Sequence, residues 1–192
     1  AFLAKYMKER YADKCVFVFA NTGKEREETL AFVNRCDQEW GLGVVWLEAD
    51  IPPVKGQGTR HKVVSIETAT RRHQKWPFDD LITKFTIPTN KGPMCTRELK
   101  INPVTSYMYR EPGFSYWHNA LGIRADEPDR LKKSRDNKYD FLYPLAEDMQ
   151  VTEKFIRSWW DRQPFDLGLK DYQGNCDLCF KKSLRKRLTI IK

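Results

Sequence analysis

The chain has 192 residues and a formal net charge of +8 at pH 7, with 41% hydrophobic and 13% aromatic residues. This length and composition favour one globular domain of moderate size and exclude a disordered chain. No apolar run approaches the roughly 20 residues that a membrane-spanning helix needs, so we expect no membrane partner. The excess of positive charge predicts anionic partners such as nucleotides, nucleic acid or acidic proteins.

The N-terminal sequence and the five cysteines predict a cytoplasmic protein. Residues 1–8 place lysines inside an apolar pattern and lack the cleavage-site logic of a signal peptide. An odd number of cysteines in such a chain favours a reducing compartment, and thiol or metal chemistry over disulfides. Cys15 and Cys36 lie on apolar faces, so we expect them in the core. The sequence does not indicate an oligomeric state.

The first predicted elements are a helix over 1–11, a strand over 15–20 and a second helix over 24–40. The strand is a continuous apolar run, as expected of a strand buried on both faces of a parallel sheet. Asn21, Thr22 and Gly23 end it, with Thr22 available to cap and Gly23 free to take a positive φ. A strand that leads through such a loop into a helix is where open α/β sheets bind ligands. An ordinary strand–helix turn is the alternative.

Later stretches continue the alternation of strands and helices. The predicted elements are a strand over 43–49, a loop over 51–60, a short strand over 61–66, a mostly helical stretch over 67–85 that breaks near Pro77, a helix over 96–109 with a kink or restart at Pro103, a strand within 114–123, a charged exposed segment over 126–140, a helix over 151–163 and a last helix from 176. The alternation predicts an α/β fold with a mainly parallel sheet and flanking helices, in a single domain over 1–192.

Three other cysteines have the spacing of metal ligands. Cys176 and Cys179 form a Cys-x-x-Cys pair, whose turn brings both thiolates to one side. Cys95 begins a helix after a loop, where the helix dipole favours the thiolate. With His118 as fourth ligand, the three cysteines would suit structural zinc. A packing corner of reduced cysteines is the alternative.

Five segments occur in an order that is typical of one family. They are 16–23 with Glu28-Thr29-Leu30, then Cys95-Thr96-Arg97-Glu98-Leu99-Lys100, Gly122-Ile123-Arg124-Ala125-Asp126-Glu127, Tyr143-Pro144-Leu145 and Cys176-Asp177-Leu178-Cys179. They are spread over most of the chain, which resembles the phosphoadenosine phosphosulfate (PAPS) reductase family of the PP-loop superfamily. The resemblance implies an adenine nucleotide α-hydrolase-like, Rossmann-like fold with a C-terminal helical segment that carries the Cys-x-x-Cys corner.

The resemblance also implies an activity and cofactors. It implies an enzyme, an oxidoreductase or sulfurtransferase, that binds an adenine nucleotide (ATP or PAPS). Such an enzyme would act in sulfonucleotide reduction or in adenylation-dependent sulfur transfer. Cys95, Cys176 and Cys179 would then hold a [4Fe-4S] cluster with one open iron, and this resemblance alone favours iron–sulfur over zinc.

The nucleotide site that the resemblance implies is drawn from several segments. Asn21, Thr22 and Gly23 match a loop near the adenine and ribose, while Gly122 and Arg124 match the stretch near the phosphate or sulfate. An arginine at a strand end presents a planar fork that matches phosphate oxygens. A surface ion pair with Asp126 or Glu127 is the alternative for Arg124. Further positive charge would come from Arg130 and, on one face of the Cys95 helix, from Arg97 and Lys100.

The sequence departs from the family pattern at both ends. In the family, a first strand and a Ser-Gly-Gly-x-x-Ser phosphate loop precede the helix predicted over 1–11, and the sequence begins just after their place. Two explanations stay open: the sequence is a piece of a longer protein, or the protein lacks the loop. PAPS reductases also carry a C-terminal Glu-Cys-Gly-type tail, which is absent from 188–192. A relative that uses the same nucleotide fold is therefore favoured over a true reductase.

A non-catalytic relative that binds tRNA or DNA is the alternative function. The last predicted helix has basic residues on neighbouring parts of one surface, and it has an apolar set that we expect to pack inward. The basic residues are Lys181, Lys182, Arg185 and Lys186, and the apolar residues are Leu184, Leu188 and Ile191. A solvated helix face is the remaining explanation for the charge.

Overall fold

A computed structural model describes residues 1–192 except 136–139, 171, 175, 177–178 and 192. Contacts divide the chain into two compact units. Unit 1 comprises 1–15 and 114–166, and unit 2 comprises 16–113 and 167–192. Each unit has its own sheet and its own buried apolar residues. The prediction of a single domain over 1–192 stays a prediction.

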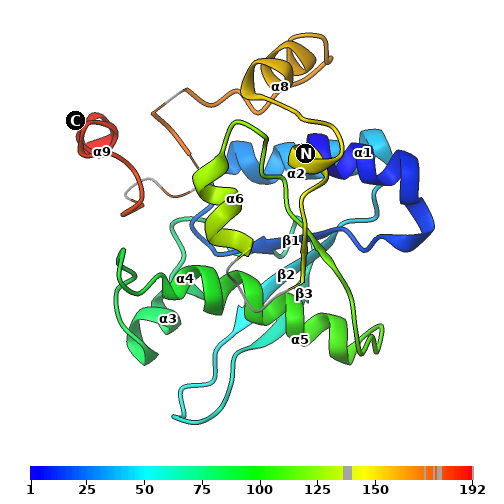
Figure 1. Cartoon of the computed structure of the whole chain (residues 1–192). Helices are drawn as coiled ribbons and strands as arrows, with labels where there is room; N and C mark the ends of the chain where they lie inside the picture. Colours follow the sequence, from blue (N-terminus) through cyan, green and yellow to red (C-terminus); the bar gives the residue numbers. More distant parts are fainter. Residues whose placement is uncertain (136–139, 171, 175, 177–178, 192) are drawn as a thin grey trace. The chain divides into compact units, whose positions relative to one another are not determined.

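Unit 2 contains a three-stranded sheet, which Figure 1 shows with its strands side by side. Its order is β1 (Val18–Asn21), β2 (Val45–Asp50) and β3 (Arg60–Val64). β1 is parallel to β2, with Phe19 opposite Trp46, and β3 is antiparallel to β2, with Val64 opposite Trp46. The α/β class is therefore confirmed, but the sheet is mixed. The loop between β2 and β3 contains no helix, and such a direct connection joins antiparallel strands, whereas a parallel pair needs a crossover.

Helices cover both faces of this sheet. In chain order, the helices of unit 2 are α2 (Glu27–Trp40), α3 (Phe78–Lys84), α4 (Met94–Thr96), the π-helical turn η2 (Arg97–Ile101), α5 (Asn102–Arg110) and α9 (Leu184–Ile191). On one face, Leu30 of α2 packs with Trp46. On the other face, Leu81 of α3 and Leu99 of η2 pack with Ala49. Trp46 and Ala49 point to opposite faces because side chains alternate along a strand.

The strand buried on both faces is β2 rather than β1. β2 is the central strand, and Trp46, Leu47 and Ala49 are all buried. Within the described sheet β1 is an edge strand, and the preceding Val16 is exposed. The prediction that 15–20 forms a strand buried on both faces is therefore wrong, because the strand covers only Val18–Asn21 and its apolar residues are half-buried.

Several predicted helices are shorter in the structure. The stretch 67–85 is helical only in α3, after the cis peptide bond between Trp76 and Pro77. The prediction for 96–109 is confirmed, since α4, η2 and α5 follow one another and Pro103 stands in the first turn of α5. Proline is tolerated there because its missing N–H is not needed in a first turn.

The last helix, α9, is also shorter than predicted. It begins at Leu184 rather than near 176, and Leu184, Leu188 and Ile191 are exposed. The prediction that these three side chains pack inward is therefore wrong, because the described residues do not cover them. Within the described part of the chain, no helix has both the length and the apolar composition to cross a membrane.

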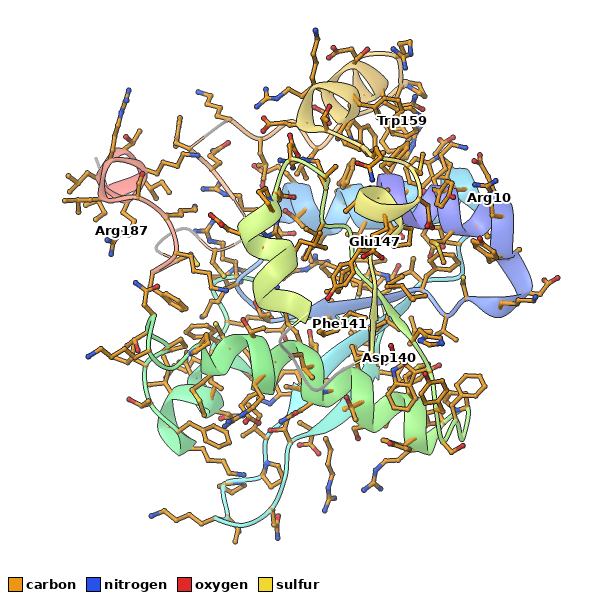
Figure 2. All side chains as sticks on the ribbon, viewed as in Figure 1. Arg10, Asp140, Phe141, Glu147, Trp159 and Arg187 are labelled. Atoms are coloured by element: carbon orange, nitrogen blue, oxygen red, sulfur yellow. The ribbon has the colours of Figure 1, made fainter. Side chains whose placement is uncertain are left out.

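Unit 1 is mostly helical. Its elements are α1 (Phe2–Tyr11), the 3-10 turn η1 (Ala12–Lys14), β4 (Asn119–Ala120), α6 (Pro128–Arg135), β5 (Phe141–Leu142), α7 (Pro144–Glu147) and α8 (Glu153–Trp160). β4 pairs with β5 in parallel, and Ile123 packs with Tyr143 and Ala146. Aromatic contacts join α1 to α8, since the ring of Phe2 lies 5.0 Å from that of Trp159, which Figure 2 labels.

Candidate functional site

The loop after β1 is held in place by a buried carboxylate of β2. Asn21 Nδ2 donates to Glu48 Oε1 at 2.6 Å and to the carbonyl oxygen of Thr70 at 3.0 Å. The backbone N–H and the hydroxyl of Thr70 donate to the two oxygens of Glu48 at 2.6 and 3.0 Å. Glu48 is only 1% exposed, so these donors replace water around its carboxylate. The side chain of Asn21, which the resemblance places near an adenine, is engaged within the protein.

A second buried carboxylate, Glu25, closes the same loop. It accepts hydrogen bonds from the backbone N–H of Thr22 at 2.8 Å, from the Thr22 hydroxyl at 2.8 Å and from the backbone N–H of Lys24 at 3.3 Å. The sequence made Thr22 available to cap helix α2, but in the structure Thr22 does not cap it. The helix begins only at Glu27, and Glu25 folds back onto the loop instead of joining the first turn. Amide groups that could hold a bound anion donate here to the loop's own carboxylate.

Gly23 is required by its surroundings as well as by its backbone conformation. Its φ is +72°, which confirms the prediction of a positive φ. A Cβ at this position would lie 2.8 Å from the carbonyl oxygen of Trp76 and 2.9 Å from Cδ of Pro77. No side chain fits at these distances, so glycine lets the loop approach the Trp76–Pro77 segment. The backbone N–H of Gly23 donates to Asn21 Oδ1 at 3.2 Å.

Beside this loop, a pocket of about 590 Å³ is lined by Cys95, Cys176 and Cys179. Two cations, Lys24 and Arg72, also line it. Its apolar wall consists of Phe78, Ile87, Pro88, Phe180, Ile190 and Ile191. The structure thus brings together in one pocket the three cysteines that the sequence groups by spacing. We call it the cysteine pocket.

Burial makes the thiol of Cys176 a weaker acid than an ordinary cysteine. It raises the pKa of this thiol to about 11, and the nearby carboxylate of Glu25 acts in the same direction. The other two cysteines of the pocket also raise it, whereas Lys100 lowers it. Cys176 is therefore a neutral thiol at pH 7, and without a further partner it is not an activated nucleophile.

Positive charge gathers around the cysteine pocket. The pKa of Lys182 is lowered by burial first and then by the charges of Arg26 and Arg72. The amine of Lys24 lies 3.2 Å from the carbonyl oxygen of Gln74, 3.8 Å from Asp79 Oδ1 and 5.4 Å from the centre of the Phe78 ring. Cations that repel one another at one place favour the binding of an anion there.

The predicted basic residues on the Cys95 helix differ in their surroundings. Arg97 Nε donates to Glu98 Oε1 at 2.7 Å, so its charge is paired within the protein. Lys100 is exposed, and its charge reaches Cys176. Of these two predicted residues, Lys100 is the one whose charge acts on the cysteine pocket.

The three cysteines of the pocket do not form a metal site as they are placed. Among the described residues, no three or more His, Cys, Asp or Glu side chains are grouped closely enough to hold one metal ion. As placed, Cys95, Cys176 and Cys179 share a pocket without forming a coordination set. His118, the predicted fourth zinc ligand, belongs to unit 1, where its Nδ1 lies 2.9 Å from Asp140 Oδ2. The [4Fe-4S] and zinc predictions stay predictions, and no chemical step is derived through a metal.

In unit 1, Arg124 is surrounded by carboxylates. Its Nε donates to Asp126 Oδ1 at 2.8 Å, and its terminal nitrogens lie 3.6 Å from Glu127 and 3.5 Å from Glu153. Glu127 also pairs with Arg130, the other predicted basic residue of this stretch. The ion pairs that the sequence offered as the alternative reading are thus present. The prediction that Arg124 and Arg130 contact a nucleotide stays a prediction.

These ion pairs lower the pKa values of two carboxyl groups, those of Asp126 and Glu127. The backbone N–H of Glu153 and then the guanidinium of Arg124 hold the pKa of Asp126 below its usual range. Burial alone would raise the pKa of Glu127, but hydrogen bonds from Arg130 and from the backbone of Arg124 lower it overall. Unlike Gly23, Gly122 is not required by packing, since an added Cβ would lie at ordinary distances of 3.8–3.9 Å from its neighbours.

Four residues of the site were not predicted from the sequence. Lys24 and Arg72 line the cysteine pocket, and Glu25 and Glu48 hold the loop. The sequence does hint at a special role for Glu48, because it is the one charged residue in the apolar run 44–49. It gives no such hint for Arg72, because this residue lies in a stretch that the pattern assigned to a helix.

The chain is similar to one curated protein of a bacteriophage. It is 37% identical over 180 residues to the "Uncharacterized nin region protein ORF290" of Escherichia phage lambda. The match covers 93% of this chain and 60% of the phage protein, so the chain spans about 60% of the length of this relative. No family model matches the chain, and no solved structure matches it.

Proposed function

We propose that the chain is a PAPS reductase-like protein that binds an adenine nucleotide and acts in sulfonucleotide reduction or adenylation-dependent sulfur transfer. The proposal includes the adenine nucleotide α-hydrolase-like fold that the resemblance implies. The observation that carries it is the cysteine pocket, in which Cys95, Cys176 and Cys179 lie beside the cations Lys24 and Arg72. Thiols next to cations suit a substrate that carries both sulfur and negative charge.

The two parts of the pocket have separate roles in this proposal. Lys24 and Arg72 would hold the phosphate or sulfate groups of the nucleotide, since both are cations on the pocket wall. The cysteines would supply thiol or metal chemistry. The volume of about 590 Å³ lies within the range of small-molecule sites. The buried Glu25 and Glu48 would position the loop that carries Lys24, rather than contact the ligand.

Titration calorimetry with ATP and with PAPS tests the nucleotide part, with GTP as the comparison ligand. We expect binding of at least one adenine nucleotide and a loss of about tenfold or more in the Arg72→Ala variant. Arg35→Ala is a matched control, because Arg35 pairs with Glu39 at 2.7 Å on the surface of α2. Equal affinities for the wild type and Arg72→Ala would remove the cysteine pocket from the nucleotide site.

Metal content tests the cysteine part. If the three cysteines hold one metal centre, then Cys95→Ala, Cys176→Ala and Cys179→Ala will each lose the same bound metal. Anaerobic purification, an ultraviolet–visible spectrum and elemental analysis distinguish iron–sulfur from zinc. Cys36→Ala is the control, because Cys36 is buried in α2. Protein that carries neither iron nor zinc under these conditions would contradict a metal role.

A second candidate function is nucleic-acid binding through α9. Lys181, Arg185 and Lys186 are exposed, and the sequence after Cys179 contains no acidic residue. If this face binds tRNA or DNA, affinity will fall steeply with salt, because each neutralised phosphate releases counterions. Changing Lys182 and Lys186 to Ala would reduce that salt dependence. A gel-shift series without binding at low ionic strength would leave the basic residues as a solvated face.

A further inference from the structure

A second pocket of unit 2 lies between β3 and α5 and has a volume of about 510 Å³. It shares no lining residue with the cysteine pocket. The β3 side contributes Gly58, Thr59 and Arg60. The α5 side contributes Asn102, Thr105, Ser106, Tyr109 and Arg110. All but Gly58 carry a hydrogen-bonding side chain, so both sides of the pocket offer polar groups to a ligand. We call this pocket the β3–α5 cleft.

Two arginines of the cleft differ from the other arginines discussed above. Within the described residues, the guanidinium groups of Arg60 and Arg110 have no hydrogen-bond or ion-pair partner. Arg97 and Arg124, by contrast, are each paired with a carboxylate at 2.7–2.8 Å. Two unpaired guanidinium groups on one pocket favour an anion, and their planar forks match phosphate oxygens. The buried carboxylate beside the pocket, Glu98, is itself paired with Arg97.

The polar groups beneath the arginines are fixed in position. Glu98 is buried, and it accepts hydrogen bonds from the Thr59 hydroxyl and, at 2.9 Å, from Asn102 Nδ2. Ser106 Oγ lies 2.9 Å from Nδ1 of His61, whose side chain is almost fully buried. Three lining residues are thus held by buried partners, so the cleft keeps its shape without a ligand.

We propose that the β3–α5 cleft binds phosphate groups, either of a nucleic-acid strand or of a free phosphorylated molecule. Arg60 and Arg110 would contact the phosphate oxygens, and the hydroxyl of Thr105 or Ser106 would donate to the same group. Tyr109 is 56% exposed, so its ring can stack on a nucleobase beside that phosphate. This site goes beyond the proposed function, because it uses neither the cysteines nor the nucleotide loop.

The double variant Arg60→Ala/Arg110→Ala tests the proposal with two probes. One is a fluorescein-labelled single-stranded DNA of about 12 nucleotides, followed by anisotropy at several salt concentrations. The other is inorganic pyrophosphate, followed by titration calorimetry. We expect at least one probe to bind the variant about tenfold or more weakly. For the single-stranded DNA, the slope of log affinity against log salt should fall by about 1.4, which is about 0.7 for each of the two lost phosphate contacts.

Matched variants keep the result interpretable. Lys5→Ala/Arg35→Ala removes the same charge from two exposed i,i+4 ion pairs and should leave both affinities unchanged. Arg60→Lys/Arg110→Lys keeps the charge but loses the planar forks, so it should bind more weakly with a nearly unchanged salt slope. It also serves as the test if the alanine variant does not fold, which thermal denaturation would reveal.

The outcomes separate the sources of the phosphate. Weaker DNA binding in the variant assigns the cleft to a nucleic-acid strand, and weaker pyrophosphate binding alone assigns it to a small phosphorylated molecule. No binding of either probe by the wild type, or equal losses in the variant and in the charge control, would overturn the proposal. Arg72→Ala should leave the binding of both probes to the cleft unchanged. Failure of the phosphate proposal is therefore distinguishable from failure of the proposed nucleotide site.

Discussion

The two units place their carboxylates in contrasting environments. In unit 2, Glu25 and Glu48 are almost fully buried and accept hydrogen bonds from amide and hydroxyl donors. In unit 1, Asp126 and Glu153 are largely exposed and surround the guanidinium of Arg124. Buried acceptors fix geometry, because each unsatisfied partner would cost desolvation energy. Exposed ion pairs contribute little, because water and salt screen them.

The largest expected effect is at Glu48. Glu48→Ala removes the acceptor for Asn21 and Thr70 and leaves their buried donors without partners. We expect the free energy of unfolding to fall by about 3–5 kcal/mol in urea denaturation. Glu48→Gln keeps the size and one acceptor oxygen, so it should lose less. A loss below about 1 kcal/mol for Glu48→Ala would mean that this carboxylate does not hold the loop.

Gly23 gives the next largest effect. Gly23→Ala introduces a Cβ 2.8 Å from a backbone carbonyl at a residue with φ +72°. Gly43 has nearly the same conformation, φ +69°, with no atom within 4 Å of the added Cβ, so Gly43→Ala is a matched control. We expect Gly43→Ala to lower the free energy of unfolding by about 1–2 kcal/mol from backbone strain alone, and Gly23→Ala to lower it clearly more. Equal losses would show that the approach of Trp76 is not limiting.

Arg124 gives a smaller effect on stability. Arg124→Ala removes ion pairs from a side chain that is 25% exposed, and we expect less than about 1 kcal/mol in the free energy of unfolding. If Arg124 also contacts a nucleotide, as the resemblance implies, the variant should bind ATP or PAPS about 1.5–3 kcal/mol more weakly. Calorimetry with equal affinity for both proteins would remove Arg124 from the nucleotide site and leave it as an ion-pair residue.

The smallest effect is the pH dependence of the unit 1 carboxylates. The folded-state pKa of Asp126 is lowered by the backbone N–H of Glu153 and by Arg124. A lowered pKa stabilises the fold above the unfolded value of about 4, and this contribution is lost as the pH falls through the folded value. The urea midpoints of the wild type and Asp126→Asn should therefore differ at neutral pH and converge in acid. A difference that grows in acid would contradict the assignment.

Local patterns were enough to predict the elements that form the loop and the grouping of the cysteines. The apolar run before Asn21, the need for glycine at 23 and the Cys-x-x-Cys spacing each depend on neighbouring residues, and neighbours are visible in a sequence. The antiparallel direction of β3 was not predicted, because a strand pattern carries no information about the direction of its partner.

Other features depend on residues that are distant in sequence. The pairing of Asn21 with Glu48 and Thr70 joins three segments that no local pattern connects. The same holds for Arg60 and Arg110, which lie 50 positions apart and line one cleft. Leu188 was wrongly predicted to be buried. A helical apolar pattern predicts a buried face even where the described residues do not cover it.

The most direct test of the proposed nucleotide site is the protection of its cysteines. The rates of alkylation by iodoacetamide are measured by mass spectrometry for each cysteine, with and without saturating ATP or PAPS. We expect at least one of these nucleotides to slow the labelling of Cys95 and Cys179, which line the cysteine pocket. The labelling of Cys15, in unit 1, should be unchanged, and GTP should have no effect. Unchanged labelling of both pocket cysteines in the presence of either nucleotide would contradict it.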